Sequence, residues 1–225
     1  MRLGSDVDWI GWLDDDEAPH ARWLAELVDT QRATDADVVM GPSMPIFESP
    51  VPHWLEAPFA SAHFTTGASF PFNYARTSGI IMRASVVPEE RFDHRLALTG
   101  GEDRVMFTRV HRNGGTFAWN DDAVVDEWIP ESRASLRWLS QRWFRKGVTR
   151  SLAMLILDNP SWSRRLRRVV GGTGRGMLGI ALTAWAARRG RGAAVGVAPR
   201  IFFGFGAAYG ALGRDYQEYR KVHGS

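Results

Sequence analysis

The stretch Trp9-Ile10-Gly11-Trp12-Leu13-Asp14-Asp15-Asp16-Glu17 joins a short apolar segment to four consecutive acidic side chains. The run from Val7 to Leu13 is rich in Val, Trp and Ile, which predicts a buried strand. Side chains alternate along a strand, so we expect Asp14 and Asp16 on one side and Asp15 on the other. The carboxyl ends of strands are where α/β sheets bind ligands, and Mg²⁺ or Mn²⁺ suits paired carboxylates whose remaining ligands are substrate phosphates. A solvated acidic loop that caps the next helix is the alternative interpretation.

A second acidic motif is Thr99-Gly100-Gly101-Glu102-Asp103-Arg104. The two glycines permit a tight turn, and the carboxylates then occupy the first turn of a predicted helix, where the helix dipole stabilises anions. A carboxylate held there could take the proton from a hydroxyl nucleophile as a general base. Alone, acids in a first helical turn are ordinary helix caps.

The first half of the chain alternates strands and helices. Strands are predicted at 7–13, 37–41, 79–83, 116–119 and 123–127, and helices at about 19–32, with Pro19 at the first helical position, and at 102–112. Residues 42–75 are predicted to form a long irregular stretch, which is typical of a functional loop. This alternation indicates an α/β domain over residues 1–131.

The second half differs in charge and pattern. Residues 1–131 carry 22 acidic and 10 basic side chains, whereas residues 132–225 carry 3 and 18, almost all of the basic ones arginine. A long helix is predicted at about 132–157, followed by the apolar segments 177–187 and 193–212 with arginines around them. These features predict an all-α, membrane-associating region over 132–225, with interfacial or re-entrant helices favoured over a spanning hairpin because Arg200 interrupts the second segment.

Small residues and arginines suggest how this second region is used. The spacing of Gly204, Gly206, Gly210 and Gly213 would allow helices to approach closely. The arginine clusters are expected to meet an anionic partner, either lipid headgroups or nucleic acid. The interleaved apolar segments favour an anionic membrane surface at the cytoplasmic side, so no nucleic-acid partner is expected.

The ordered motifs resemble family 2 glycosyltransferases with the GT-A fold. The resemblance covers residues 9–127 and rests on the following segments in this order: W-I-G-W-L-D-D-D-E-A-P (9–19), V-V-M-G-P (38–42), T-S-G-I-I-M-R (77–83), T-G-G-E-D (99–103), F-T-R-V-H-R-N-G-G (107–115) and D-A-V-V-D-E (122–127). The arginine-rich helix and the ending from Tyr209 to Arg220 resemble the corresponding parts of bacterial polysaccharide glycosyltransferases that associate with the membrane.

The resemblance implies a reaction and roles for individual residues. Asp14 and Asp16 match the D-x-D motif that holds the metal ion and the donor diphosphate. Asp103 matches the catalytic base that deprotonates an acceptor hydroxyl, with inversion at the anomeric carbon, and Glu102 would orient the acceptor or Asp103. Arg142 and Arg145, three residues apart on one helical face, could clamp the diphosphate. The expected partners are a nucleotide-sugar donor and a lipid-linked or polysaccharide acceptor, and the expected location is the cytoplasmic face of the cell membrane, by peripheral or re-entrant attachment.

The resemblance also predicts that the sheet domain is incomplete. Members of the family carry about half a domain before the D-x-D strand, and here only 13 residues precede Asp14. The expectation is therefore an incomplete GT-A, Rossmann-like sheet domain that lacks much of the nucleotide-binding half. Two other hypotheses stay open: a catalytically inactive, membrane-attached fragment or scaffold, and a basic nucleic-acid-binding module in residues 132–225.

Overall fold

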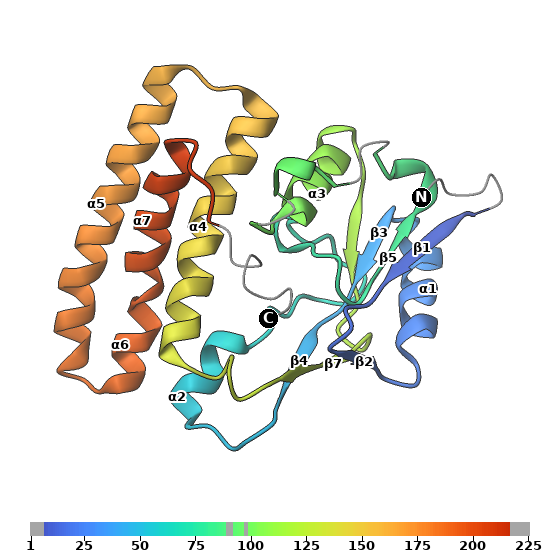
Figure 1. The fold of residues 1–225 in the computed structure, drawn as a ribbon. Coiled ribbons are helices and arrows are strands. Elements are labelled where there is room, and N and C mark those ends of the chain that lie inside the picture. The colour runs from blue at the N-terminus through green and yellow to red at the C-terminus, as the bar shows by residue number, and fades with distance from the viewer. Residues whose placement is uncertain (1–6, 89–91, 97–98, 217–225) are drawn as a thin grey trace, which may run out of the picture. The chain divides into compact units, whose positions relative to one another are not determined.

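The computed structural model describes residues 7–88, 92–96 and 99–216, which form two compact units (Figure 1). The sheet unit comprises Met1–Glu48, Ala60–Phe92 and Met106–Ile129, and the helical unit comprises Ser49–Phe59, Asp93–Val105 and Pro130–Ser225. A mixed α/β architecture is therefore confirmed. The domain division at residue 131 stays a prediction, as does the resemblance of residues 217–220, which lie outside the described residues.

The sheet unit holds two small sheets. Its strands are β1 (Trp9–Trp12), β2 (Glu17–Pro19), β3 (Val38–Met40), β4 (Ser43–Phe47), β5 (Ile80–Arg83), β6 (Phe117–Trp119) and β7 (Val125–Ile129). The first sheet has the order β1-β5-β3-β6, in which only the β3–β6 pair is parallel, and the second has the order β2-β7-β4, in which β4 and β7 are parallel. The predicted strands at 7–13, 37–41, 79–83 and 116–119 are confirmed to within a few residues.

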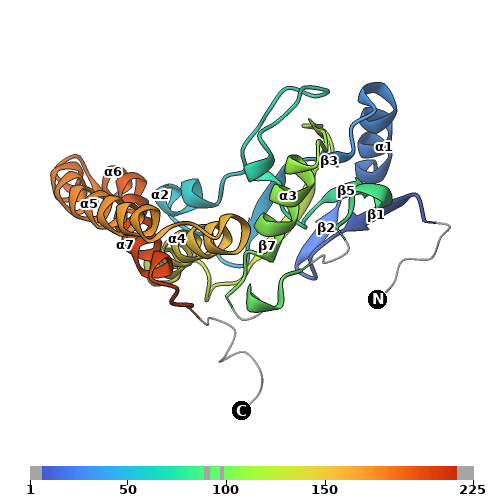
Figure 2. The ribbon, with the colours of Figure 1, turned by 90° about the horizontal axis from the view of Figure 1, so that it is seen from above.

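The four-stranded sheet is buried on both faces at β3, β5 and β6, because helices cover it from opposite sides (Figure 2). On one face, Val39 packs with Trp23 and Leu27 of α1 (Trp23–Thr34). On the other face, Val38 and Met40 pack with the part of α3 (Glu102–Arg112) that lies in the sheet unit. The alternation of side chains along β3 thus supplies two hydrophobic cores from one strand.

The helical unit is built mainly from long helices. Its α-helices are α2 (His53–Glu56), α4 (Leu136–Asp158), α5 (Trp162–Ala187), α6 (Arg191–Val197) and α7 (Pro199–Ala211). Short 3₁₀ turns lie at Ala57–Phe59, Phe72–Tyr74, Ala84–Val86 and His94–Leu96, the second and third of them in the sheet unit. The Ser135 side chain caps α4 by accepting a hydrogen bond from the Trp138 N–H at 3.2 Å.

Two sequence expectations were wrong in detail. Pro19 does not open a helix: it lies in β2, an edge strand, where its missing N–H costs no ladder bond, and α1 begins at Trp23. The stretch 42–75 is not wholly irregular, since it contains β4 and α2. The apolar segment 193–212 contains a helix boundary at Pro199, which begins α7. Within the described ranges, no helix has the length and apolar character needed to cross a membrane.

Glycines on α7 allow its two neighbours to pack against its backbone, as the spacing predicted. A Cβ on Gly206 would stand 2.1 Å from the Phe144 oxygen of α4, and one on Gly204 would stand 2.5 Å from the Gly176 nitrogen of α5. Gly210 packs in the same way against Val148 of α4. Gly213 lies beyond the helix and adopts a left-handed backbone conformation with φ +79°. The close packing of α4, α5 and α7 therefore depends on the absence of side chains at Gly204, Gly206 and Gly210.

Gly206→Ala is expected to lower the free energy of unfolding by about 2 kcal/mol, because backbone atoms of α4 have to move to admit the methyl group. Urea denaturation followed by circular dichroism measures this change. Gly174→Ala in α5 is the matched control: a Cβ there meets no atom within 4 Å, so the higher helix propensity of alanine is expected to stabilise the protein by about 0.5–1 kcal/mol. Equal effects of the two substitutions would contradict close packing at Gly206.

Candidate functional site

The acidic run after β1 forms a turn rather than a continuation of the strand. The Glu17 N–H donates to the Asp14 carbonyl oxygen at 3.1 Å, and the Asp14 N–H donates to Glu17 Oε2, also at 3.1 Å. The Asp16 carbonyl oxygen accepts from the Trp128 N–H at 2.8 Å, which joins the turn to β7. The expectation that strand alternation orients Asp14 and Asp16 is therefore wrong. Because residues 14–17 form a turn, carboxylates that would point to opposite sides of a strand can lie near one another.

This turn belongs to a larger acidic cluster within the sheet unit. Glu17 lies opposite Glu127 in the β2–β7 ladder and accepts a hydrogen bond from the Ser78 hydroxyl. Glu127 accepts a hydrogen bond from the Ser43 hydroxyl at 2.8 Å. Partial burial raises the pKa of Glu17, and the Glu127 charge adds to this, although the hydrogen bonds from Ser78 and the Asp14 backbone oppose it. Two serine hydroxyls thus hold a pair of facing glutamates.

Asp14 has the most strongly raised pKa in the acidic cluster. Partial shielding of its carboxylate from water raises its pKa from 3.8 to about 6, and the charges of Glu17, Asp16 and Glu127 add to the rise. Its residue surface is exposed overall, so the carboxylate stays reachable from solvent. Arg76 opposes the shift, yet its Nε and Nη2 atoms are buried without a hydrogen-bond partner in the described part of the chain. The cluster therefore holds excess negative charge beside one poorly satisfied guanidinium.

The donor set fits a hard divalent cation only in part. Carboxylate oxygens are the ligands that Mg²⁺ prefers, and a cation would relieve the repulsion that raises the pKa of Asp14. Among the residues that the structure describes, no three Asp, Glu or His side chains are arranged to hold a metal ion by themselves. Binding of Mg²⁺ or Mn²⁺ by Asp14 and Asp16 therefore stays a prediction, and it would need further ligands from outside the cluster, such as water.

The second acidic motif begins α3 in the helical unit. Gly101, with φ +91°, packs so closely on α4 that a Cβ would stand 2.8 Å from Cβ of Thr149. Asp103 Oδ1 accepts from the Arg104 N–H at 2.6 Å. Glu102 has a buried Oε2 with no hydrogen-bond partner among the described residues, and burial raises its pKa, followed by the Asp103 charge. The predicted turn and helix start are therefore confirmed, and they place two carboxylates in different environments.

The two arginines predicted as a diphosphate clamp have different neighbours. The Arg142 guanidinium carbon lies 5.0 Å from the ring centroid of Trp138 and 5.8 Å from that of Phe59, within cation–π range. Arg145 lies close enough to Glu102 for its charge to lower the pKa of that carboxyl against the effect of burial. Arg145 thus joins the acidic motif of α3, whereas Arg142 contacts aromatic rings. Their role toward a diphosphate stays a prediction.

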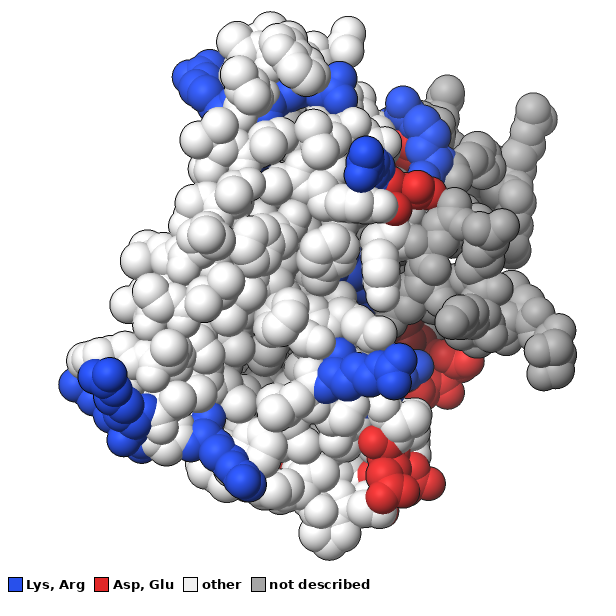
Figure 3. All heavy atoms as spheres, turned by 60° about the vertical axis from the view of Figure 1, so that its left-hand side comes forward, with Lys and Arg blue, Asp and Glu red and all other residues white. Residues whose placement is uncertain are grey.

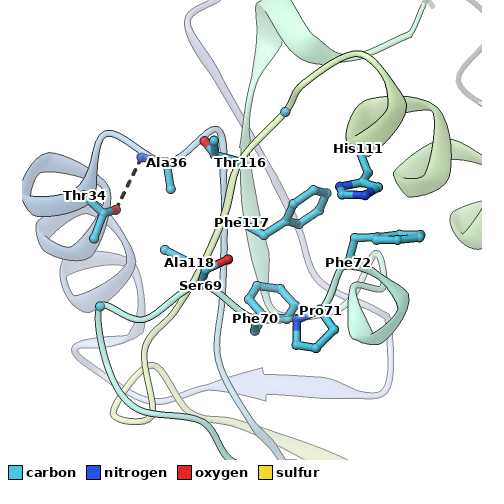
Figure 4. A pocket seen from close by; sticks show the side chains of 12 residues that line it. Thr34, Ala36, Ser69, Phe70, Pro71, Phe72, His111, Thr116, Phe117 and Ala118 are labelled. Atoms are coloured by element: carbon cyan, nitrogen blue, oxygen red, sulfur yellow. Dashed lines mark hydrogen bonds between the residues drawn. The ribbon is translucent and has the colours of Figure 1, made fainter.

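A pocket of about 620 Å³ lies at the other end of the four-stranded sheet (Figure 4). Its lining includes Ala36 and Thr116, which precede β3 and β6, and the stacked rings of Phe72 and His111, whose centroids are 4.2 Å apart. The acidic turn instead follows β1, whose last residue is level with the last residues of β3 and β6 in the ladder. The acidic turn therefore lies at the carboxyl ends of β1, β3 and β6, where a ligand site is expected, whereas this pocket lies at the opposite end.

Sequence reasoning did not single out several members of the acidic cluster. Glu17 and Glu127 stand within the quoted motifs, and their acidic character was the available signal. Ser43, Arg76 and Ser78 carry no such signal, because only the tertiary arrangement of the two sheets brings their segments together.

Comparison with known proteins adds an independent observation. No family model matches the chain. Over 144 residues it is 36% identical to the succinoglycan biosynthesis protein ExoM of Rhizobium meliloti (strain 1021). The chain is related to a protein of polysaccharide biosynthesis. The match covers 63% of the chain and 47% of ExoM, so the chain spans about half the length of the curated relative it matches.

Asp14→Asn is expected to raise the melting temperature by about 2 °C at pH 7.5, because an uncharged side chain removes repulsion within the cluster. Folded Asp14 binds its proton more tightly than unfolded Asp14, so its contribution to stability falls as the pH rises from 3.8 to about 6. The gain from the substitution should therefore vanish toward pH 4. Differential scanning calorimetry across this range, without divalent ions, measures it.

Asp15→Asn is the control for this measurement. Asp15 is exposed in the same turn and is not among the groups that shift the pKa of Asp14. It should change the melting temperature little at any pH. If Asp15→Asn and Asp14→Asn gave the same pH dependence, the crowding would not be specific to Asp14.

Proposed function

We propose that this chain is catalytic machinery of a GT-A glycosyltransferase of family 2, which moves a sugar from a nucleotide-sugar donor to a hydroxyl of a lipid-linked or polysaccharide acceptor. The observation that carries the proposal is the acidic turn at the carboxyl ends of the strands, where Asp14 has a pKa of about 6. Kinship with a succinoglycan biosynthesis protein supports the same class of reaction.

The proposed reaction assigns Asp103 as the general base. Its carboxylate takes the proton from the acceptor hydroxyl as the oxygen attacks the anomeric carbon. The bond from that carbon to the diphosphate oxygen breaks on the opposite face, so the configuration inverts and the nucleoside diphosphate leaves. Asp14 and Asp16 would hold a divalent cation, which when bound neutralises charge on the diphosphate. Glu102, whose pKa is raised by burial, would hydrogen-bond to the acceptor or to Asp103 as a positioning residue.

Asp103→Asn is expected to lower the rate of sugar transfer by about 10²–10⁴-fold, because an amide cannot accept the proton. Transfer of radiolabelled sugar from nucleotide donors to a membrane extract measures the rate. The nucleotide sugar itself should bind to the variant with unchanged affinity.

Asp122→Asn is the matched control, since Asp122 is exposed and lies outside both acidic motifs. Transfer that survives Asp103→Asn unchanged would show that another group is the base. Tight, Mn²⁺-dependent binding of a nucleotide sugar by residues 1–225 would rule out the alternative of an inactive scaffold.

We further propose that the helical unit lies on the cytoplasmic face of the cell membrane. The part of its surface formed by α5 exposes large apolar side chains: Trp162, Leu166, Val170, Met177, Leu178, Ile180 and Trp185. From this side the unit shows a broad uncharged face with lysine or arginine side chains toward its upper and lower ends (Figure 3). An apolar face bounded by arginines suits the interface of an anionic bilayer.

The double substitution Val170→Glu and Met177→Glu is expected to weaken binding to vesicles at least tenfold, because both apolar side chains, exposed by 64% and 60%, would lose burial in lipid. Co-sedimentation with vesicles containing phosphatidylglycerol measures this. Leu24→Glu on α1, where the side chain is 55% exposed, is the control and should not change binding. Equal loss in both variants would argue against α5 as the membrane surface.

A further inference from the structure

Four arginines from three helices lie near one another in the helical unit. Arg104 comes from α3, Arg150 from α4, and Arg168 and Arg175 stand two turns apart on α5. The guanidinium groups of Arg150 and Arg175 lie 6.0 and 5.0 Å from the centroid of one ring, that of Phe203. This set, Arg104, Arg150, Arg168 and Arg175, is called the arginine cluster below.

The positive charges of the arginine cluster repel one another, and this repulsion contributes to the lowered pKa of Arg104 and Arg168. Burial lowers the pKa of Arg104, and the charges of Arg150 and Arg168 lower it further against the opposing effect of Asp103. Burial also lowers the pKa of Arg168, followed by the charges of Arg150 and Arg175. Like charges held together in a partly buried place destabilise the fold unless an anion lies among them.

Arg168 is fixed in place but incompletely satisfied. Its Nε donates to the Ser151 hydroxyl at 3.1 Å, and this hydroxyl donates to the Ala207 carbonyl oxygen at 2.8 Å. Its Nη2 is buried and has no hydrogen-bond partner in the described part of the chain. Within those same residues, no carboxylate is at ion-pair distance from Arg150, Arg168 or Arg175. A buried donor on a charged group without a partner is costly, so an acceptor is missing from this place.

We propose that the arginine cluster is a binding site for a phosphomonoester or diphosphate group. Guanidinium groups donate paired hydrogen bonds to phosphate oxygens, and a group with two or more negative charges offsets several arginines where a single carboxylate would offset one. Arg150 and Arg175 are exposed whereas Arg104 and Arg168 are partly buried, so the site is open to solvent with a more buried base. On the proposed function, on which this assignment of the ligand rests, the group is the diphosphate of a lipid-linked acceptor.

Thermal denaturation with pyrophosphate tests the site without any transfer reaction. Pyrophosphate should raise the melting temperature of the wild-type chain by about 3–5 °C over sodium chloride of equal ionic strength. In Arg168→Gln the rise should fall below about 1 °C. Without pyrophosphate this variant should melt no lower than the wild type, because removal of one charge relieves repulsion. A purely structural role for Arg168 would instead lower the melting temperature.

Two variants act as controls for charge and for folding. Arg167→Gln removes the same charge from the neighbouring exposed position, which is not among the groups that shift the pKa of Arg104 or Arg168, and should keep the full response. Arg175 lies on the exposed side of the site, so Arg175→Gln should also lose the rise in melting temperature with pyrophosphate. If Arg167→Gln and Arg168→Gln responded alike, the effect would be general screening and the site would be overturned.

Vesicles identify the source of the phosphate. Phosphatidic acid, a phosphomonoester, is compared with phosphatidylglycerol, a diester, at equal surface charge. If the chain prefers phosphatidic acid and Arg168→Gln loses this preference, the ligand is a lipid headgroup. If the chain responds to pyrophosphate without preferring phosphatidic acid, the ligand is a soluble diphosphate. Both outcomes support the site. The pyrophosphate response is measured without any transfer reaction and does not depend on which group is the general base, so failure of the proposed reaction and failure of this site remain distinguishable.

Discussion

The sheet unit depends on the burial of both faces of β3. Val38, Val39 and Met40 are all buried, and β3 is paired on both sides, with β5 and β6. The next residue, Gly41, passes so close to Ala123 that a Cβ would stand 2.0 Å from its carbonyl oxygen. This contact fixes where the chain leaves the first sheet and enters β4, which pairs with β7. The acidic cluster depends on this arrangement, because β7 pairs with β2 and places Glu127 opposite Glu17.

Each unit brings together side chains of like charge that its other residues do not fully neutralise. In the sheet unit, Asp14 and Glu17 have raised pKa values because they are shielded from water and face other acids. In the helical unit, Arg104 and Arg168 have lowered pKa values because they are partly buried and lie near other arginines. Such arrangements reduce stability, and proteins keep them chiefly at functional sites. The ligands proposed for them are complementary in charge: a cation for the first and a phosphate group for the second.

The sequence predicted regular elements well where burial is periodic and poorly where pairing is long-range. The helix at Glu102–Arg112 begins and ends as expected, because Gly100 and Gly101 precede it and Asn113 and Gly114 follow it. The strand β4 was missed, since Pro45 lies in its centre and its partner β7 is about 80 residues away. Pro19 was assigned to a helix for a local reason, whereas its place in an edge strand is decided by β7.

The sequence by itself determined the mixed α/β class, the acidic and basic halves, the turn of two glycines before Glu102 and Asp103, and the glycine spacing of α7. These are local properties of composition and periodicity, which a chain carries before it folds. Only the tertiary structure decided that Asp14 shares its surroundings with Glu127, and that arginines of α3, α4 and α5 lie together. Those groupings join residues far apart in the chain, so their energies depend on strand pairing and helix packing rather than on any single segment.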